Sequence, residues 1–189
     1  MPDKLNVACV QLSSTTTIAE NIEISSDLIR EAHSKGANFI TLPEVVNLCQ
    51  RRSDLAVAAA RFQEEEPALA AYRKLAEELG VWLLAGSLAI KLPDDERLAN
   101  RSFLIDSGGV VVATYDKIHM FDVNLANGET FRESKTYKPG DRAVVAPTPW
   151  ATLGMTICYD VRFPYLYRSL AHAGATMLAI PSAFTRRTG

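Results

Sequence analysis

The residue best placed to act as a nucleophile is Cys158, which lies between a strand-like segment at 152–157 and a helix-like segment at 163–173. A side chain on a sharp strand-to-helix turn is exposed, and the backbone N–H groups that follow it point towards it. Such donors lower the pKa of a thiol from about 8.5 and can hold an oxyanion. By position alone, a buried structural cysteine is an equally good interpretation. Cys9, in the middle of a predicted strand, is expected in the core, and Cys49 has no comparable setting.

Three ionisable side chains could assist such a nucleophile. Glu44 and Lys117 each follow a strand-like segment, and Glu133 lies in a long polar stretch. Because the carboxyl ends of parallel strands gather at one edge of a sheet, residues at such ends can meet there. Taken singly, each of the three is more typical of a solvated surface charge. His119 keeps a second arrangement open, a Cys–His pair, since the sequence does not show which base reaches the thiol.

The elements that would position these residues are predicted from hydrophobic periodicity. The apolar segment 5–12 indicates a buried strand, and Thr17 with Glu20 forms a capping-box pattern that starts a helix. Gly36 is suited to end that helix, and 37–42 indicates a second strand. A strand, a helix and a strand in so few residues predict a parallel pair with a right-handed crossover.

The rest of the chain continues this alternation. The pattern predicts helices at 67–79 and 163–173, and strands at 81–90, 101–106, 110–115, 143–146, 152–157 and 175–180. The polar stretch 116–141 is too long for an ordinary connection, which makes it a candidate functional loop. The fold class is therefore α/β with a layered sheet.

Composition excludes several classes of protein. The 189 residues are 48% hydrophobic and 22% charged, with a net charge of −2, so neither a disordered chain nor a nucleic-acid partner is indicated. The apolar runs are too short for a membrane helix, so no membrane partner is expected either. Three scattered cysteines and three histidines match no disulfide framework and no metal site, and a cytoplasmic location is expected.

Three short motifs, in this order, resemble the nitrilase superfamily of carbon–nitrogen hydrolases. They are Leu42-Pro43-Glu44, the stretch 115–122 (YDKIHMFD) and the stretch 157–164 (ICYDVRFP). The stretches 131–140 and 181–185 are also similar to this family, so the resemblance covers nearly the whole chain. The second and third motifs look most like the Nit branch, which includes ω-amidase and deaminated glutathione amidase.

The resemblance implies a four-layer αββα sandwich with a Glu–Lys–Cys triad at Glu44, Lys117 and Cys158. Glu133 matches a second glutamate beside the triad, and the Tyr159 backbone N–H would share an oxyanion with Lys117. In this reading the Cys–His pair drops away. The implied reaction is hydrolysis of a small carboxylate-bearing amide to ammonia and an acid through a thioester, with no metal or organic cofactor.

Three arginines, Arg162, Arg186 and Arg187, are candidate anchors for the substrate carboxylate, although Arg162 is equally suited to pair with Asp160. The resemblance also implies a homodimer or higher oligomer. Residues 1–189 are expected to form a single carbon–nitrogen hydrolase domain that is incomplete at its C-terminus. The alternatives are a truncated, non-catalytic family member that acts only as a partner, and a nitrilase that acts on nitriles.

Overall fold

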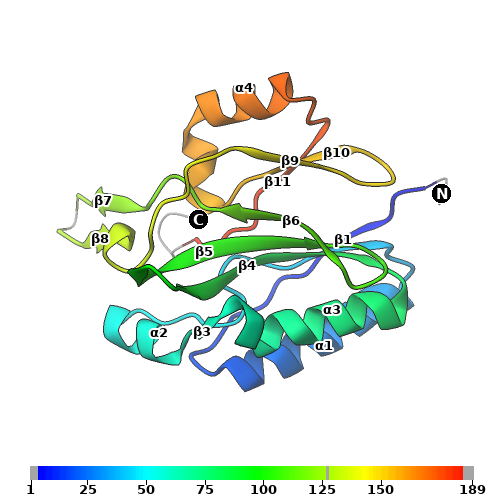
Figure 1. The fold of residues 1–189 in the computed structure, drawn as a ribbon, viewed down its shortest axis with the longest axis horizontal. Helices are drawn as coiled ribbons and strands as arrows, with labels where there is room; N and C mark the ends of the chain where they lie inside the picture. The colour runs from blue at the N-terminus through cyan, green and yellow to red at the C-terminus, as the bar shows by residue number, and fades with distance from the viewer. Residues whose placement is uncertain (1–3, 127, 185–189) are drawn as a thin grey trace.

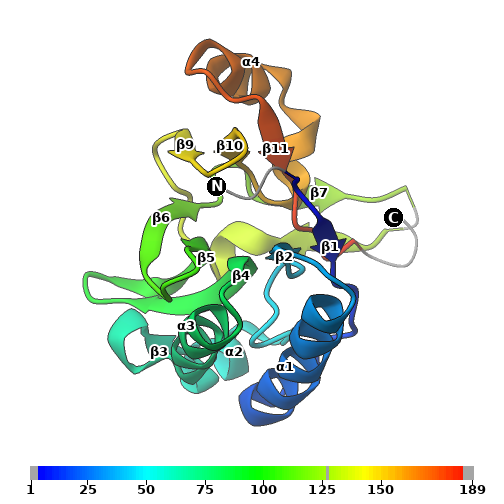
Figure 2. The ribbon, with the colours of Figure 1, turned by 90° about the vertical axis from the view of Figure 1, so that its right-hand side faces the viewer.

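Two β-sheets lie face to face, with helices on both outer sides (Figure 1). The structure, a computed structural model, describes residues 4–126 and 128–184. The first sheet has the order β1-β2-β4-β5-β6, with β3 beside β4, and the second has the order β11-β10-β9. Helices α1 and α3 cover the first sheet and α4 covers the second, which gives the four layers αββα (Figure 2). The predicted fold class is confirmed.

The bounds of the elements follow the chain. The first sheet contains β1 (Val7–Cys9), β2 (Phe39–Thr41), β3 (Arg61–Phe62), β4 (Trp82–Leu92), β5 (Asp95–Ile105) and β6 (Val111–Asp116), and the second contains β9 (Val144–Pro147), β10 (Thr152–Met155) and β11 (Met177–Ala179). The α-helices are α1 (Ile18–Ser34), α2 (Ser53–Ala59), α3 (Pro67–Leu79) and α4 (Pro164–His172). A small hairpin, β7 (Asp122–Asn124) and β8 (Thr130–Arg132), projects to one side, and the 3₁₀ turns are η1 (Gln63–Glu65), η2 (Glu133–Lys135) and η3 (Cys158–Arg162).

Alternation along the central strands divides the core into two layers. Phe39, Leu84 and Leu104 face the second sheet and pack there with residues such as Leu153. Their strand neighbours, which include Ile40, Leu83 and Phe103, face the helices instead. Successive side chains of a strand point to opposite faces, so a strand that is apolar at every position is the pattern expected between two buried faces.

Both sheets contain a parallel pair joined by a helix. α1 connects β1 to β2, and these two strands pair in parallel. In the same way α4 connects β10 to β11, which also pair in parallel. The parallel β1–β2 pair was predicted and is confirmed. Gly154 in β10 allows the close approach of α4, because a Cβ there would lie 2.8 Å from Leu178 Cδ2 and 3.3 Å from Leu170 Cδ1.

The start of α1 differs from the predicted capping box. Thr17 is the N-cap residue, but its side chain makes no capping hydrogen bond, and Glu20 accepts instead from Thr15 Oγ1 at 2.9 Å. The Asn21 side chain instead holds the loop before the helix, since its Oδ1 accepts from the Thr15 N–H and its Nδ2 donates to the Thr15 and Asn47 carbonyls. The helix is thus fixed by a residue inside its first turn that also holds the preceding loop.

Three other predictions about elements were incomplete or wrong. β5 begins at Asp95 rather than at 101, because the charged residues 95–97 hide the strand in the sequence. The short α2 and β3 were not predicted, and the stretch 116–141 contains a hairpin and a 3₁₀ turn. Cys9 is exposed rather than in the core, since β1 is an edge strand of only three residues.

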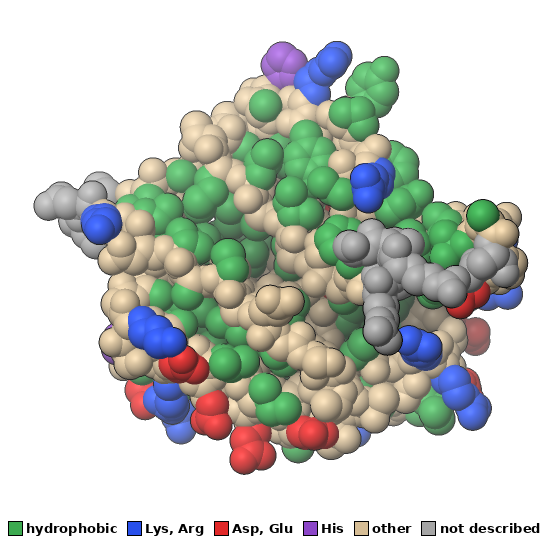
Figure 3. Space-filling model, turned by 180° about the vertical axis from the view of Figure 1, so that it is seen from behind, with side chains coloured by type: hydrophobic (Ala, Val, Ile, Leu, Met, Phe, Trp, Pro, Cys, Tyr) green, Lys and Arg blue, Asp and Glu red, His purple; other side chains and the backbone are tan. Residues whose placement is uncertain are grey.

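The back of the molecule has an apolar groove between the edge strands of the two sheets. Hydrophobic side chains gather around a hollow on that face (Figure 3). The groove, of about 640 Å³, is lined by residues of β1, β2 and β11, and Val7 in its wall is 47% exposed. Across residues 4–126 and 128–184, no helix has the length and apolar character needed to cross a membrane.

Candidate active site

Glu44 is held in a tight turn directly after β2. Val45 has a left-handed backbone (φ 49°), a strained conformation for a β-branched residue, and its N–H donates to Ser87 Oγ at 2.9 Å. Gly86 is needed because a Cβ there would lie 2.0 Å from the Leu42 carbonyl oxygen. The turn therefore lies directly on β4, and it directs the Glu44 carboxylate into the interior, where the residue is only 6% exposed.

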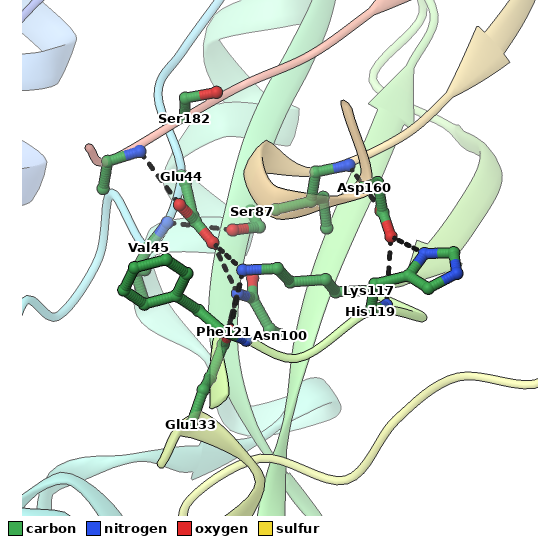
Figure 4. A network of polar contacts seen from close by, with 12 residues as sticks. Glu44, Val45, Ser87, Asn100, Lys117, His119, Phe121, Glu133, Asp160 and Ser182 are labelled. Carbon is green, nitrogen blue, oxygen red and sulfur yellow. Dashed lines mark hydrogen bonds and ion pairs between the residues drawn. The ribbon is translucent and has the colours of Figure 1, made fainter. Parts of the chain in front are cut away.

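Lys117 lies at the end of β6 with its ammonium between two carboxylates (Figure 4). Its Nζ lies 2.8 Å from Glu44 Oε1 and 2.9 Å from each carboxylate oxygen of Glu133, and the residue is 2% exposed. Burial alone lowers the pKa of Lys117, but the two carboxylates outweigh it and the net shift is upward. Lys117 is therefore a cation at neutral pH, which contradicts the interpretation as a solvated lysine.

Glu133 opens the 3₁₀ turn η2 in the long polar stretch. Its Oε2 accepts from the Phe121 backbone N–H at 2.6 Å as well as from Lys117. Burial raises the pKa of Glu133, and the attraction of Lys117 offsets part of that rise. The predicted functional loop thus places a second carboxylate against the lysine from the side opposite Glu44.

Cys158 begins η3, the turn that links β10 to α4. The residue is 8% exposed, its backbone is left-handed (φ 46°), and its N–H donates to the Pro181 carbonyl at 2.9 Å. It lines the same cavity as Glu44 and Lys117, and the charges of both residues act on its thiol. Cys158, Glu44 and Lys117, which are far apart in the sequence, are therefore brought together with Glu133 at one site.

The thiol differs from its predicted electrostatic state. Burial and the negative charge of Glu44, opposed in part by Lys117, together raise the pKa of Cys158 to about 12. The expected lowering by turn N–H groups is therefore wrong. Burial and a nearby negative charge both favour the neutral thiol, so Cys158 rests as a thiol near a carboxylate base.

Asp160 holds the turn that carries Cys158. Its Oδ2 accepts from the Ile157 N–H at 2.9 Å and from Tyr115 Oη at 2.7 Å, and its Oδ1 lies 3.0 Å from the His119 N and 2.7 Å from His119 Nδ1. The His119 ring stacks on Phe163 at a centroid distance of 3.7 Å. His119 is therefore a partner of Asp160, and the expected Arg162–Asp160 pair does not occur.

A cavity of about 330 Å³ opens beside these groups. Its wall includes Glu44, Lys117, Glu133 and Cys158 together with apolar residues, among them Phe121, Phe131 and Tyr159. Arg162 lines it as predicted, and Arg51 and Arg132 were not predicted. Arg186 and Arg187 lie outside the described residues.

Two further features of the site concern hydrogen-bond donors. No hydrogen bond within the described part of the chain uses the Tyr159 N–H, which follows the nucleophile candidate directly. Asn100 on β5 was missed by sequence reasoning, although it donates to Glu44 Oε1 at 2.9 Å. Its signal was hidden because the strand was predicted to begin one residue later. Among the residues described, no group of three or more acidic, histidine or cysteine side chains could hold a metal.

This combination of an αββα sandwich and a Cys, Lys and paired-Glu site defines one class of protein. The model of the carbon–nitrogen hydrolase family matches residues 6–188, and the chain belongs to that family. It is 37% identical over 186 residues to a deaminated glutathione amidase of Yersinia enterocolitica, covering 97% of this chain and 64% of the relative. It is 32% identical over 183 residues to an omega-amidase of Homo sapiens, covering 97% of this chain and 65% of the relative.

A solved structure shows the same fold. The NitFhit protein of C. elegans superimposes with a TM-score of 0.84 at 34% identity, covering 96% of this chain and 44% of that one. The chain therefore spans a little under two thirds of the length of the two curated relatives. The resemblance to the nitrilase superfamily and its Nit branch is confirmed.

Proposed function

We propose that the protein is an amidase in which Cys158 attacks a small carboxylate-bearing amide. The observation that carries this proposal is that Cys158, Glu44 and Lys117 line one cavity, where the Glu44 carboxylate lies 2.8 Å from the Lys117 ammonium. An amide carbonyl is a poor electrophile, so both a strong nucleophile and oxyanion stabilisation are needed. The names of the two curated relatives, both amidases, support the same reaction class.

The first half-reaction forms a thioester. Glu44 accepts the thiol proton as the Cys158 sulfur bonds to the carbonyl carbon, and the carbonyl oxygen becomes an oxyanion. Lys117 Nζ and the Tyr159 N–H donate to that oxygen, and the latter is free to do so. Collapse of the oxyanion breaks the carbon–nitrogen bond, and Glu44 returns its proton to the leaving nitrogen, which departs as ammonia.

The second half-reaction releases the acid. Water loses a proton to Glu44 and attacks the thioester carbonyl carbon, and the same two donors hold the second oxyanion. Breaking the carbon–sulfur bond gives the carboxylic acid, and Glu44 returns the proton to the sulfur. Glu133 acts through Lys117 and not on the substrate. Both carboxylate oxygens of Glu133 lie 2.9 Å from Lys117 Nζ and hold the ammonium in place.

The substrate class is suggested by the arginines of the cavity. Arg51 and Arg162 line it, and the side chain of neither forms an ion pair or hydrogen bond with another described residue. A carboxylate at the far end of a substrate would give such a guanidinium a bidentate partner. The apolar wall formed by Phe121, Phe131 and Tyr159 suits a short aliphatic chain between the carboxylate and the amide.

The test is an ammonia-release assay with the full-length gene product. We expect turnover of ω-amides of short carboxylic acids, slower turnover of uncharged amides of equal length, and slower turnover of the matching nitriles. Cys158→Ala should abolish release, while Cys49→Ser, at an exposed thiol that also lines the cavity, should not. A folded protein that releases no ammonia, or an active Cys158→Ala variant, would refute the proposal and favour a non-catalytic role.

A further inference from the structure

Asn100 is a buried amide that contacts both carboxylates of the site. It is 1% exposed, and its Nδ2 lies 2.9 Å from Glu44 Oε1 and 3.3 Å from Glu133 Oε1 (Figure 4). Its backbone carbonyl accepts from the Lys117 N–H at 3.0 Å. Asn100 is not among the residues that line the cavity, so it meets the carboxylates from behind.

The orientation of this amide follows from its neighbours. Both carboxylates are acceptors, so the nitrogen and not the oxygen of Asn100 must face them. The Asn100 Oδ1 is then left buried without a hydrogen-bond partner among the described residues. A buried unpaired acceptor costs free energy, and a side chain kept at such a cost is a candidate for a functional role.

A neutral donor is what this position requires. Glu44 Oε1 and Glu133 Oε1 lie around one ammonium, at 2.8 Å and 2.9 Å from Lys117 Nζ, and two like charges so placed repel each other. An amide donor adds attraction to both oxygens without adding charge. It also occupies one lone-pair direction of Glu44 Oε1, which leaves Oε2, held by the Ala183 N–H at 2.9 Å, as the oxygen free of Lys117 and Asn100.

We propose that Asn100 is a positioning residue that fixes Glu44 and Glu133 about Lys117 and holds the Glu44 carboxylate in place to accept the thiol proton. This inference rests on the proposed function for its effect on turnover, but its effect on the thiol does not depend on the substrate. The titratable groups that face the two carboxylates are Lys117 at the end of β6, Cys158 on η3 and Tyr137 after η2.

The experiment measures the pH dependence of two rates on the full-length protein. One is ammonia release, and the other is alkylation of Cys158 by iodoacetamide, followed by peptide mass spectrometry so that Cys9 and Cys49 are counted separately. Where a carboxylate of the site is the base, both rates fall at acid pH. Asn100→Leu removes the donor, so the acid limb should move upwards by about one pH unit.

In the same variant, kcat should change much more than KM. We expect Asn100→Leu to lower kcat by about tenfold to a hundredfold, as for loss of a hydrogen bond to a charged group, with KM changed less than about twofold. Asn100→Ser, which adds no volume and is too short to reach the carboxylates, should show the same shift of the acid limb. Ser102→Ala is the matched control, since Ser102 is buried on the same strand and on the same face, and it should leave both the limb and kcat unchanged.

Several outcomes would overturn the inference. One is a folded Asn100→Leu or Asn100→Ser protein whose pH–rate profile has the same acid limb as the unmodified protein. Another is an acid limb that shifts as far in Ser102→Ala as in the Asn100 variants. Unfolding of both Asn100 variants, seen by circular dichroism, would make the residue structural and would also overturn it. A shifted alkylation limb in a protein that hydrolyses no amide would uphold the positioning role and reject the proposed function, so the two failures are distinguishable.

Discussion

At the scale of single residues, the site is defined by one ammonium in a buried ring of oxygens. Lys117 is 2% exposed and its Nζ lies within 2.9 Å of three carboxylate oxygens. Nothing in the sequence around Lys117 distinguishes it from a surface lysine, because burial is created by segments 73 and 16 residues away. The family motifs identified it, whereas its local pattern did not.

This geometry predicts the effect of a conservative change at Lys117. Lys117→Arg keeps the charge, but a planar guanidinium is larger than the space between Glu44 and Glu133 and would displace the oxyanion donor. We expect kcat for ammonia release to fall by at least about 10²-fold, as for loss of an oxyanion donor. Lys135→Arg, at an exposed lysine two residues beyond Glu133, is the control and should be neutral. A near-normal rate in Lys117→Arg would remove the lysine from the oxyanion site.

At the scale of elements, the turn η3 depends on a single buried carboxylate. Asp160 is 0% exposed and accepts from the Ile157 N–H, the Tyr115 hydroxyl and the His119 N–H, so it ties the turn to β6 and to the segment after it. The left-handed backbone of Cys158 is strained and persists only where its surroundings determine it. Asp160 supplies those surroundings.

Replacing that carboxylate should therefore affect stability and activity together. Asp160→Asn would turn a donor towards at least one N–H or O–H, and we expect the free energy of unfolding in urea to fall by about 3 kcal/mol. Ammonia release should fall as well, because Cys158 would lose its orientation. Asp106→Asn is the matched control, since Asp106 Oδ1 accepts from the Gly108 and Val110 N–H groups and an asparagine Oδ1 can do the same. Equal losses in the two variants would contradict the role given to Asp160.

The family motifs predicted the site better than the local sequence patterns did. The order of Glu44, Lys117 and Cys158 in their motifs predicted which residues meet, since each follows a strand of a layered sheet. The capping box and the lowered thiol pKa were wrong, because both were judged from neighbours in sequence. Asn21 and Glu44, which act instead, depend on tertiary contacts with Asn47 and with Cys158.

At the scale of the whole molecule, two apolar surfaces are candidate sites of association with another chain. One is α4, where Leu166 and Leu170 are buried and Tyr165 is 77% exposed. The groove between β1 and β11 is the larger apolar feature, and it includes two short edge strands. Exposed edges of this kind favour pairing with another chain.

Residues 1–189 expressed alone should therefore associate through the groove. We expect them to be poorly soluble, with light scattering showing aggregates at micromolar concentration. Val7→Lys, which places a charge on the β1 edge, should reduce the scattering. Tyr165→Lys on α4 is the control and should reduce it less. A larger effect of Tyr165→Lys would assign association to α4 instead, and a monodisperse 1–189 protein would refute the prediction altogether.

The neutral state of the Cys158 thiol affects how readily this residue is oxidised. Peroxide attacks the thiolate, and over-oxidised cysteine is not recovered by ordinary reductants. With a pKa of about 12 and an exposure of 8%, Cys158 offers almost no thiolate to a passing oxidant. The exposed Cys9 and Cys49 are the more accessible targets. A nucleophile that becomes an anion only as it attacks therefore presents little thiolate to oxidants between encounters.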